Sequence, residues 1–563
     1  MCPLTSVWAQ LSTNEKPISF GIKSGMTVKR RSAKAVAKMP SIDIAKIEAE
    51  DLKDKENFLP PRFGYKHKVN YNLDNSGTWY TLSNGDMLWK LNIVCPEAIS
   101  VNFCYDKFWI PEGGKFFIYS KDEKQYIGAY TSRNNRGNRE SPRGFATELI
   151  KSNDVVLEYY QPKNVTSDAI ISIDYVVHGY KDLIMDTKSY YNDPDNNCMV
   201  NVNCDEGRKW QEEKRAVALM VVEGYRYGTG SLITTTDSDH KPYFLTADHC
   251  LGGWANWVKH DAVSYPELDY YTFYWNYETP GCYMENIEPI PYTTSGARVL
   301  ANNSVSDFAL LELSEDPIEL PNYTPFYLGW DNSGSPGEPG VCIHHPCCDV
   351  KKISSVRYTP GSSSWDYTPN THWEVYWKET WNGFGTTNPG SSGSALLTKD
   401  HKVIGQLHGG WSSCSQSGKN EPDYYGKFSV SWNGYGNDSI QRKLSCWLDS
   451  LNIGCQTMNG LTTLSRADSI SDYVQLKNDY VITKNGELTL DGYFGELELI
   501  GDVRLIVEKG GKLIIDGGKL LNAELVLKPG ATLQIKNEGV IETRHGFKAQ
   551  KGAIVDIQYG WIY

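Results

Sequence analysis

The chain has 563 residues, more than one hydrophobic core usually organises, and this length predicts about three or four folded units. Its 56 Lys and Arg against 68 Asp and Glu give a net charge of -12 at pH 7, which argues against binding to nucleic acid or to an anionic membrane. No run approaches the roughly 20 apolar residues of a transmembrane helix, so no membrane span is expected.

The composition favours β structure. The chain contains 50 Gly, 36 Tyr and 17 Trp, and its apolar residues occur in short alternating runs such as 101–103 and 488–490, as in strands separated by turns. Long amphipathic helical patterns are scarce. We therefore expect an all-β protein.

Two segments precede the middle of the chain. Residues 1–9 end in a small residue after Val-Trp, so we interpret them as the remnant of a truncated signal peptide, with an ordinary N-terminal end as the alternative. Residues 10–188 hold strand-like runs separated by turn signals such as 75–77 and 84–86, which predict a β-sandwich-like unit. The polar stretch 193–197 indicates a boundary.

Three further segments complete the chain. Residues 189–456 are rich in Cys and Trp and carry the motifs that indicate chemistry. A stretch containing Ser, Thr and Asp, 457–479, predicts a linker. Residues 480–563 repeat a Gly turn followed by an alternating strand, as in 485–490 and 529–535, which predicts a β-repeat unit, either a small solenoid or a sandwich.

Two residues of the middle segment have the pattern of a catalytic His and its acid. His249 lies in Leu-Thr-Ala-Asp-His-Cys, directly after an apolar run, and should sit just beyond a strand. Asp307 opens Asp-Phe-Ala-Leu-Leu-Glu-Leu, where a carboxylate at the edge of the core needs a partner. An imidazole N–H is suitable, because the acid fixes the tautomer of the His and stabilises its charged form.

The nucleophile that this pair would serve is Ser392. It lies in Asn-Pro-Gly-Ser-Ser-Gly-Ser-Ala-Leu, a Gly-rich turn that leads into a strand-like run. Such a loop presents the hydroxyl to a general base and directs the backbone N–H groups of Gly390 and Ser392 to one point, which predicts an oxyanion hole. An ordinary Ser/Gly turn has the same sequence, so the order His, Asp, Ser carries the prediction of a triad.

This chemistry needs no cofactor, and no metal site is expected. The sequence HHPCC at 344–348 is not interpreted as a zinc site, because adjacent residues rarely reach one tetrahedral ion together.

Six phrases follow one another along the middle segment: YFLTADHC (243–250), YWNY (274–277), SDFALLEL (306–313), IHHP (343–346), PGSSGS (389–394) and GQLHGG (405–410). Through them residues 198–452 resemble the bacterial lysyl endopeptidases, a branch of the chymotrypsin-type serine proteases. The first block resembles the propeptide of that family through PRFG (61–64), SGTW (76–79), WIP (109–111) and VHGY (177–180).

The resemblance implies a chymotrypsin-like fold of two Greek-key β-barrels, between an N-terminal β-sandwich-like propeptide and the C-terminal β-repeat domain. His249 and Asp307 would lie on the first barrel and Ser392 on the second. The implied function is a secreted, monomeric serine endopeptidase, extracellular or at the cell surface, that hydrolyses protein or peptide substrates after Lys through an acyl-enzyme. Its other partner would be its own propeptide.

Five residues are implied to bind substrate. Asp423 would form the base of the primary specificity pocket, where a buried carboxylate pairs with an ammonium group. His408 and Trp365 match the family's stacked His and Trp beside that pocket, and Gly409 and Gly410 would let the substrate backbone pair as an added strand. The alternatives are an ordinary aromatic side chain at Trp365 and a pocket that accepts Arg as well as Lys.

The cysteines follow the family in part. Its pattern implies the disulfides Cys198–Cys414 and Cys204–Cys282. The bridge beside the catalytic His lacks a partner, because Gly228 stands where a Cys is expected, so Cys250 should be free or differently paired. The sequence leaves open the pairing of five further cysteines, among which we expect an additional bridge: Cys342, Cys347, Cys348, Cys446 and Cys455.

Activation and export are the last expectations. Ser391 stands where activation by a buried new N-terminus requires Asp, so we expect instead that residues 10–188 act as a folding aid or inhibitor and are removed by cleavage after Lys188.

The phrase GFKAQKGA (546–553) resembles tail modules of surface and secreted proteins of the Bacteroidetes, which implies a secretion or surface-retention role; a plain accessory domain is the alternative. A non-catalytic homologue that binds a surface partner or glycan is the remaining rival, although such homologues usually lose a triad member.

Overall fold

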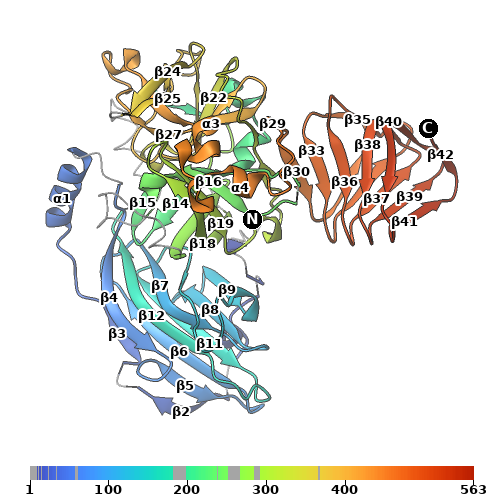
Figure 1. Ribbon diagram of the computed structural model, residues 1–563. Helices are drawn as coiled ribbons and strands as arrows, with labels where there is room; N and C mark the ends of the chain where they lie inside the picture. The colour runs from blue at the N-terminus through green and yellow to red at the C-terminus, as the bar shows by residue number, and fades with distance from the viewer. Residues whose placement is uncertain are drawn as a thin grey trace.

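In the computed structural model β-strands are the main secondary structure, and they are arranged in three bodies (Figure 1). No helix in the described part is long and apolar enough to cross a membrane. The expected leader, apart from its last residue, and the proposed cleavage site at Lys188 lie outside the described residues. These residues are 9–10, 12–13, 15–22, 25–32, 34–56, 61–181, 198–237, 239–251, 267–283, 292–365 and 368–563.

The N-terminal body is a two-sheet sandwich, and α1 (Ile44–Glu56) lies at its outer side (Figure 1). One sheet contains β2 (Thr27–Arg31), β3 (Val36–Lys38), β5 (Thr78–Thr81), β6 (Met87–Val94), β8 (Lys115–Ser120), β9 (Tyr126–Tyr130) and β11 (Asp154–Gln161). The other contains β4 (Gly64–Asn72), β7 (Ser100–Trp109), β10 (Phe145–Ala146) and β12 (Ile170–Gly179). Alternate apolar residues of both sheets, such as Leu91 and Phe103, share one buried core. The predicted sandwich is confirmed.

The first barrel in the middle of the chain is a closed antiparallel sheet. Its strands are β14 (Val217–Val222), β15 (Tyr225–Leu232), β16 (Tyr243–Ala247), β17 (Glu267–Trp275), β18 (Tyr292–Asn303) and β19 (Phe308–Leu313). The sheet closes because β18 pairs with both β17 and β19. The short strand β1 (Ala9–Gln10) adds to β18 in parallel.

The second barrel lies above the first in Figure 1. Its strands are β22 (Pro339–His344), β23 (Lys352–Ser355), β25 (Thr368–Val375), β26 (Ala395–Thr398), β27 (Lys402–Gly410) and β28 (Asp423–Lys427). An isolated bridge between Val356 and Trp377 joins the ends of β23 and β25 and completes the circuit. Flanking elements are β13 (Val200–Asn201), β21 (Gly329–Asp331), β24 (Gly361–Trp365), α3 (Phe428–Asn433) and α4 (Ser445–Leu448). The chymotrypsin-like double barrel is therefore confirmed.

The C-terminal body is a β-solenoid, whose coils stack through parallel pairs such as β34–β37 and β37–β39. Inward-facing Leu and Ile residues of successive coils, such as Leu513 above Leu533, form its core. Its strands are β30 (Leu461–Leu464), β31 (Ala467–Ile470), β32 (Tyr473–Leu476), β33 (Asp479–Ile482), β34 (Glu487–Asp491), β35 (Glu496–Leu499), β36 (Arg504–Val507), β37 (Lys512–Asp516), β38 (Lys519–Leu527), β39 (Thr532–Lys536), β40 (Gly539–Ala549), β41 (Ile554–Ile557) and β42 (Gly560–Ile562).

The prediction of a linker at 457–479 was wrong. This stretch contains β29 (Thr457–Met458) and the solenoid strands β30, β31 and β32. Strands of four residues with polar outward side chains carry a weak periodic signal, and their pairing is supplied by the next coil, as between Leu461 and Asp479. The Ser, Thr and Asp residues that gave this stretch the composition of a linker therefore lie in the first coils of the solenoid.

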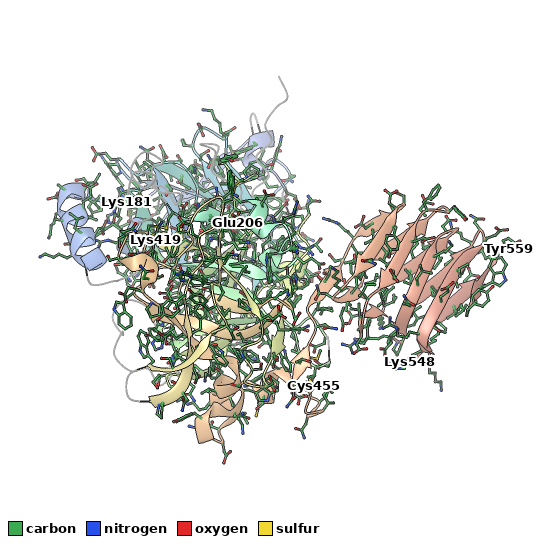
Figure 2. All side chains as sticks on the ribbon, turned by 90° about the horizontal axis from the view of Figure 1, so that it is seen from above. Lys181, Glu206, Lys419, Cys455, Lys548 and Tyr559 are labelled. Atoms are coloured by element: carbon green, nitrogen blue, oxygen red, sulfur yellow. A yellow bond between two sulfur atoms is a disulfide. The ribbon has the colours of Figure 1, made fainter. Side chains whose placement is uncertain are left out.

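Both outer bodies pack against the first barrel. On the N-terminal side, the backbone N–H of Phe63 donates to the carbonyl of Gly224, and Arg143 pairs with Asp269 at 2.6 Å. On the other side, β20 (Phe326–Tyr327) pairs with β30, and three solenoid residues enter the core of the barrel: Leu461, Val481 and Ile506. Figure 2 shows Cys455 near the point where the chain passes into the solenoid and Tyr559 at the far end.

Candidate active site

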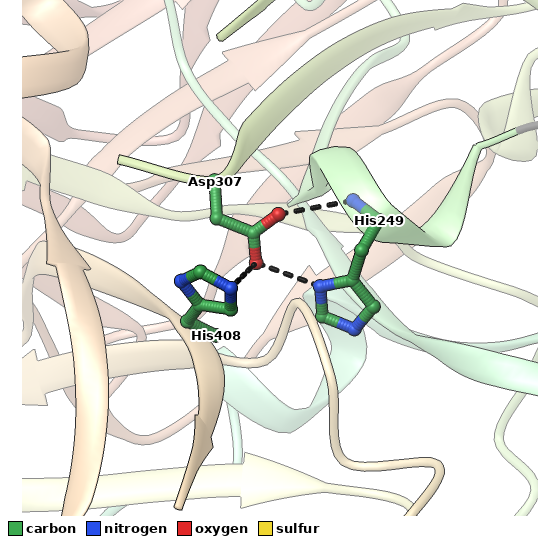
Figure 3. Close-up of side chains that lie close together, drawn as sticks. All are labelled: His249, Asp307 and His408. Carbon is green, nitrogen blue, oxygen red and sulfur yellow. Dashed lines mark hydrogen bonds and ion pairs between the residues drawn. The ribbon is translucent and has the colours of Figure 1, made fainter. Parts of the chain in front are cut away.

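His249 and Asp307 are brought together by two neighbouring strands of the first barrel. His249 lies in a short turn, η5 (Asp248–Cys250), at the end of β16, and Asp307 directly precedes β19, which pairs with β16. One carboxylate oxygen, Oδ2, lies 2.7 Å from Nδ1 of His249, and Oδ1 accepts the backbone N–H of His249 at 3.0 Å (Figure 3). Asp307 has a φ of 54°, a strained conformation for a residue other than Gly. Both oxygens of this buried carboxylate thus fix the imidazole.

Asp307 and His249 shift each other's pKa values in the directions of an ion pair. Burial raises the pKa of Asp307, but the charges of His249 and His408 and the hydrogen bond to His249 outweigh it, so the pKa falls below its ordinary value. Burial lowers the pKa of His249, but the charges of Asp307 and Cys250 and the hydrogen bond to Asp307 raise it well above its ordinary value.

This shift predicts the position of the acid limb of the pH profile. A general base acts only when neutral, and a raised pKa keeps His249 protonated to higher pH, so kcat/KM should rise with pH through an apparent pKa above about 6.5. The pH dependence of kcat/KM measures this value for the free enzyme. In Asp307→Asn the limb should move to lower pH, and a parent limb at or below about 6.5 would contradict the assignment.

The loop that carries Ser392 precedes β26 of the second barrel and docks against the first. The backbone N–H of Thr229, on β15, donates to the carbonyl of Ser392 at 2.9 Å, and the Thr229 hydroxyl donates to the carbonyl of Gly390 at 2.8 Å. A Cβ on Gly393 would lie 2.2 Å from Oγ1 of Thr246, so only Gly allows this approach. The half-buried Ser392 is thus held beside the turn of His249.

Two backbone N–H groups of this loop are not used in hydrogen bonds within the described part of the protein. The N–H groups of Ser391 and Gly393 donate to carbonyl oxygens of the protein, at 2.8 and 2.9 Å. Among the residues that the structure describes, those of Gly390 and Ser392 have no protein acceptor. Gly390 has a φ of 101°, which turns the backbone as Gly permits. The two unused donors are the pair expected from the sequence.

Sequence reasoning missed His344, which holds the same loop. Its Nδ1 lies 2.8 Å from the hydroxyl of Ser391 and its Nε2 lies 3.0 Å from the hydroxyl of Ser354. Burial lowers the pKa of His344 to about 3, so the ring is neutral. The neighbouring His345 instead approaches the carbonyl of Asp349 through Nδ1. The doubled His was the available signal, but it gave no indication of a contact with Ser391.

The structure contains both disulfides that the resemblance implies, Cys198–Cys414 and Cys204–Cys282. Cys250 is a buried free thiol, and a Cβ on Gly228 would lie 2.9 Å from its Sγ. The two positions thus face each other as the family's missing bridge requires. Cys342, Cys446 and Cys455 are also free thiols.

Gly228→Cys should therefore create a third disulfide with Cys250. Closing a loop of roughly 20 residues should stabilise the protein by about 3 kcal/mol, less any strain from the close contact with Met220, whose Cε would lie 3.2 Å from the new Cβ. The measurements are the number of free thiols and the unfolding midpoint with and without reductant. The double variant Gly228→Cys/Cys250→Ser is the control, and a reductant-insensitive midpoint in the single variant would contradict the prediction.

Asp423, at the start of β28, is a fully buried carboxylate. It accepts hydrogen bonds from the indole of Trp377 at 2.6 Å, the hydroxyl of Thr387 at 2.7 Å and the hydroxyl and backbone N–H of Ser412 at 2.6 and 3.2 Å. Burial still raises its pKa, although these bonds oppose the shift. A Cβ on Gly410 would lie 2.1 Å from Oδ1, so only Gly at this position of β27 allows the carboxylate to lie so close to the strand. A carboxylate buried in this way interacts favourably with a cation that is brought next to it.

His408 lies between the expected pocket wall and the triad. Its ring stacks on Trp365 at 4.2 Å between centroids, and its Nε2 lies 3.7 Å from Oδ2 of Asp307 (Figure 3). Sequence reasoning missed His372, whose Nε2 lies 3.0 Å from Nδ1 of His408. Burial lowers the pKa of His372 to about 3, so this ring is neutral. No motif surrounds His372, and only the pairing of β25 with β28 brings it here.

The middle of the chain is similar to a known protein family. The family model of the lysyl endopeptidase C-terminal domain matches residues 193–426. Among solved structures, the active form of the Rv3671c protease from M. tuberculosis is 16% identical, with a TM-score of 0.24, over 39% of this chain and 79% of that chain. A Glu endopeptidase in complex with MPD is 16% identical, with a TM-score of 0.23, over 38% and 85%. Over residues 193–426, which include most of both barrels, the chain is thus similar to the lysyl endopeptidase C-terminal domain.

Proposed function

We propose that the two barrels form a serine endopeptidase that cleaves after Lys. One observation carries the proposal. Both carboxylate oxygens of the buried Asp307 contact His249, one at the ring and one at the backbone N–H, and the loop of Ser392 packs against the same barrel. The match to the lysyl endopeptidase model over residues that include all three supports the same function.

The mechanism follows from the roles of these groups. Nε2 of His249 takes the proton of Ser392 while Oγ attacks the substrate carbonyl, and the N–H groups of Gly390 and Ser392 stabilise the resulting oxyanion. His249 then donates the proton to the amine as the C–N bond breaks, which leaves an acyl-enzyme. Water, deprotonated by His249, hydrolyses this ester and regenerates Ser392. Asp307 stays ionised throughout and stabilises the imidazolium.

Specificity for Lys is assigned to Asp423, with Trp365 and His408 beside it. A desolvated carboxylate whose pKa is raised by burial gains most from a substrate ammonium, whereas a neutral side chain leaves it uncompensated. The stacked rings of Trp365 and His408 would narrow the pocket against a planar guanidinium, and Gly409 and Gly410 on the same strand would pair with the substrate backbone. A pocket that also accepts Arg is the second candidate.

The outer bodies are assigned to maturation and export. The N-terminal sandwich packs on the first barrel, which supports a role as a folding aid for that barrel. Two disulfides support passage through an oxidising compartment, as expected for a secreted or surface protein. The solenoid would then serve secretion or surface retention.

Digestion of an unfolded protein that contains both Lys and Arg tests the proposed activity. The secreted product and its Ser392→Ala variant are compared, and every new terminus is read by mass spectrometry. Cuts confined to Lys and absent from the variant are expected. Cuts after Arg as well would retain the triad but remove the argument for a narrowed pocket, and no cuts by the processed protein would favour the binding-module alternative.

Maturation is tested by Lys188→Gln. If the enzyme cleaves its own chain after Lys188, this variant should remain as a full-length precursor, because Gln lacks the charge that Asp423 would bind. The masses of the secreted chains measure the outcome. The Lys181→Gln variant is the control, since Lys181 pairs with Asp51 in the N-terminal body. Normal maturation of Lys188→Gln would exclude this cleavage site.

A further inference from the structure

The carboxylate of Asp307 lies between two imidazole rings rather than beside one (Figure 3). Its Oδ2 is 2.7 Å from Nδ1 of His249 and 3.7 Å from Nε2 of His408. In the described part of the chain these three side chains form a cluster whose ligand atoms all lie within 4.8 Å of one another. The side chains of His249 and His408 are 24% and 17% exposed, so solvent reaches the cluster.

Hydrogen bonds behind His408 fix which of its nitrogens faces Asp307. The hydroxyl of Thr371 donates to the carbonyl of Thr368 at 3.1 Å, so Nδ1 of His372 must donate to the Thr371 oxygen at 2.8 Å. Nε2 of His372 lies 3.0 Å from Nδ1 of His408, so this nitrogen of His408 is engaged on the side away from Asp307. Nε2 is therefore the nitrogen of His408 that faces the carboxylate.

Nδ1 of His249, Nε2 of His408 and Oδ2 of Asp307 are thus grouped as three ligands of one ion would be. We propose that Asp307, His249 and His408 bind a divalent transition-metal ion such as Zn²⁺, which inhibits the peptidase reversibly. Imidazole nitrogen and carboxylate oxygen are ligands that Zn²⁺ prefers, at about 2.0–2.2 Å. Tetrahedral ligand atoms at such distances are about 3.3 Å apart, and the separations of 2.7 and 3.7 Å bracket this value. Water would occupy the fourth position.

The inhibition follows from where the proton of His249 must go. In the resting enzyme Nδ1–H donates to Asp307 and Nε2 holds the lone pair that accepts the proton of Ser392. When the metal binds Nδ1, the N–H bond there breaks, the proton passes to solvent, and Nε2 takes up a proton from solvent. The metal–nitrogen and metal–oxygen bonds replace the bond between His249 and Asp307, and a protonated Nε2 accepts nothing from Ser392.

Metal binding is measured first without catalysis. The Ser392→Ala protein, which retains all three ligands, is titrated with Co²⁺, whose visible absorption reports coordination, and with Zn²⁺ in equilibrium dialysis. One ion per chain is expected. Adding His408→Gln or His249→Gln should weaken binding at least about 10-fold, since even groups outside the coordination shell contribute about that much. The control is His401→Gln. His401 pairs with Glu213 at 2.8 Å and is not part of the cluster, so this variant should bind the metal ion as before.

Inhibition of the active enzyme is measured second, and this effect alone rests on the proposed function. Zn²⁺ should inhibit peptide hydrolysis, EDTA should restore it, and the inhibition constant of His408→Gln, relative to its own uninhibited rate, should rise at least about 10-fold. A protein without peptidase activity would reject the proposed function while the Co²⁺ titration still judges the site. Thermal unfolding shows whether the variants fold. If they fold and bind Zn²⁺ with the same affinity as the parent protein, the inference is overturned; this applies to His408→Gln and to His249→Gln.

Discussion

Replacing Ser392 by Ala should lower kcat for a Lys peptide by about 10⁶-fold, the size of effect that removal of a catalytic Ser produces. The hydroxyl is the nucleophile in the proposed mechanism, and no neighbouring group occupies the same place: the hydroxyl of Ser391 points to His344. The measurement is the single-turnover and steady-state rate on a chromogenic Lys substrate, with thermal unfolding to show that the fold is kept.

Ser391→Ala is the matched control for this experiment, because it removes the adjacent hydroxyl. It breaks the contact with His344 that holds the loop, so some activity should be lost, but orders of magnitude less than in Ser392→Ala. An equal loss in both variants would mean that loop order, not the Ser392 hydroxyl, accounts for the effect.

Asp423→Asn should lower kcat/KM for Lys substrates by about 10³-fold while sparing substrates with an uncharged side chain of similar length. Removing one partner of a buried, hydrogen-bonded charge pair costs about 2–5 kcal/mol, and about 4 kcal/mol corresponds to that factor. The measurement is the ratio of kcat/KM for a Lys peptide to that for the corresponding norleucine peptide, so that a general loss of activity cancels.

The control for the charge is Ser412→Ala, which removes one hydroxyl bonded to Asp423 but leaves the carboxylate. Its Lys-to-norleucine ratio should change far less than that of Asp423→Asn. If the ratio stays the same in Asp423→Asn, Asp423 is a structural residue buried among hydrogen bonds, and the specificity must arise elsewhere.

Much of the site follows from the sequence, because its residues lie at the ends of strands that the sequence marks. His249 follows β16 and Asp307 precedes β19, and the pairing of these strands brings the residues together without further information. The Gly residues around Ser392 mark a tight turn, and the structure explains Gly393 by the proximity of Thr246. Local sequence therefore predicts the all-β class and the candidate residues, whereas the double barrel follows from the family resemblance.

Residues that reach the site only through strand pairing could not be predicted. His372 meets His408 because β25 lies beside β28, which in turn pairs with β27, and no local pattern announces this order. His344 reaches Ser391 in the same way, because β22 pairs with β26, which follows the loop of Ser391. The start of the solenoid was missed for a related reason, since the stability of each short strand resides in its neighbours.

The union of the solenoid with the first barrel determines what the C-terminal body can do mechanically. Leu461, Val481 and Ile506 belong to the hydrophobic cluster of the barrels, and Glu212 accepts hydrogen bonds from Thr462 and Asn478. In the described residues this junction is therefore packed and is not an extended linker. A flexible tether lets an enzyme search a sphere around its anchor. If the far end of the solenoid were attached to a surface, as proposed for surface retention, the two barrels would instead be held at a fixed distance and orientation from that surface. The proposed active site would then act only on substrates that come to that distance.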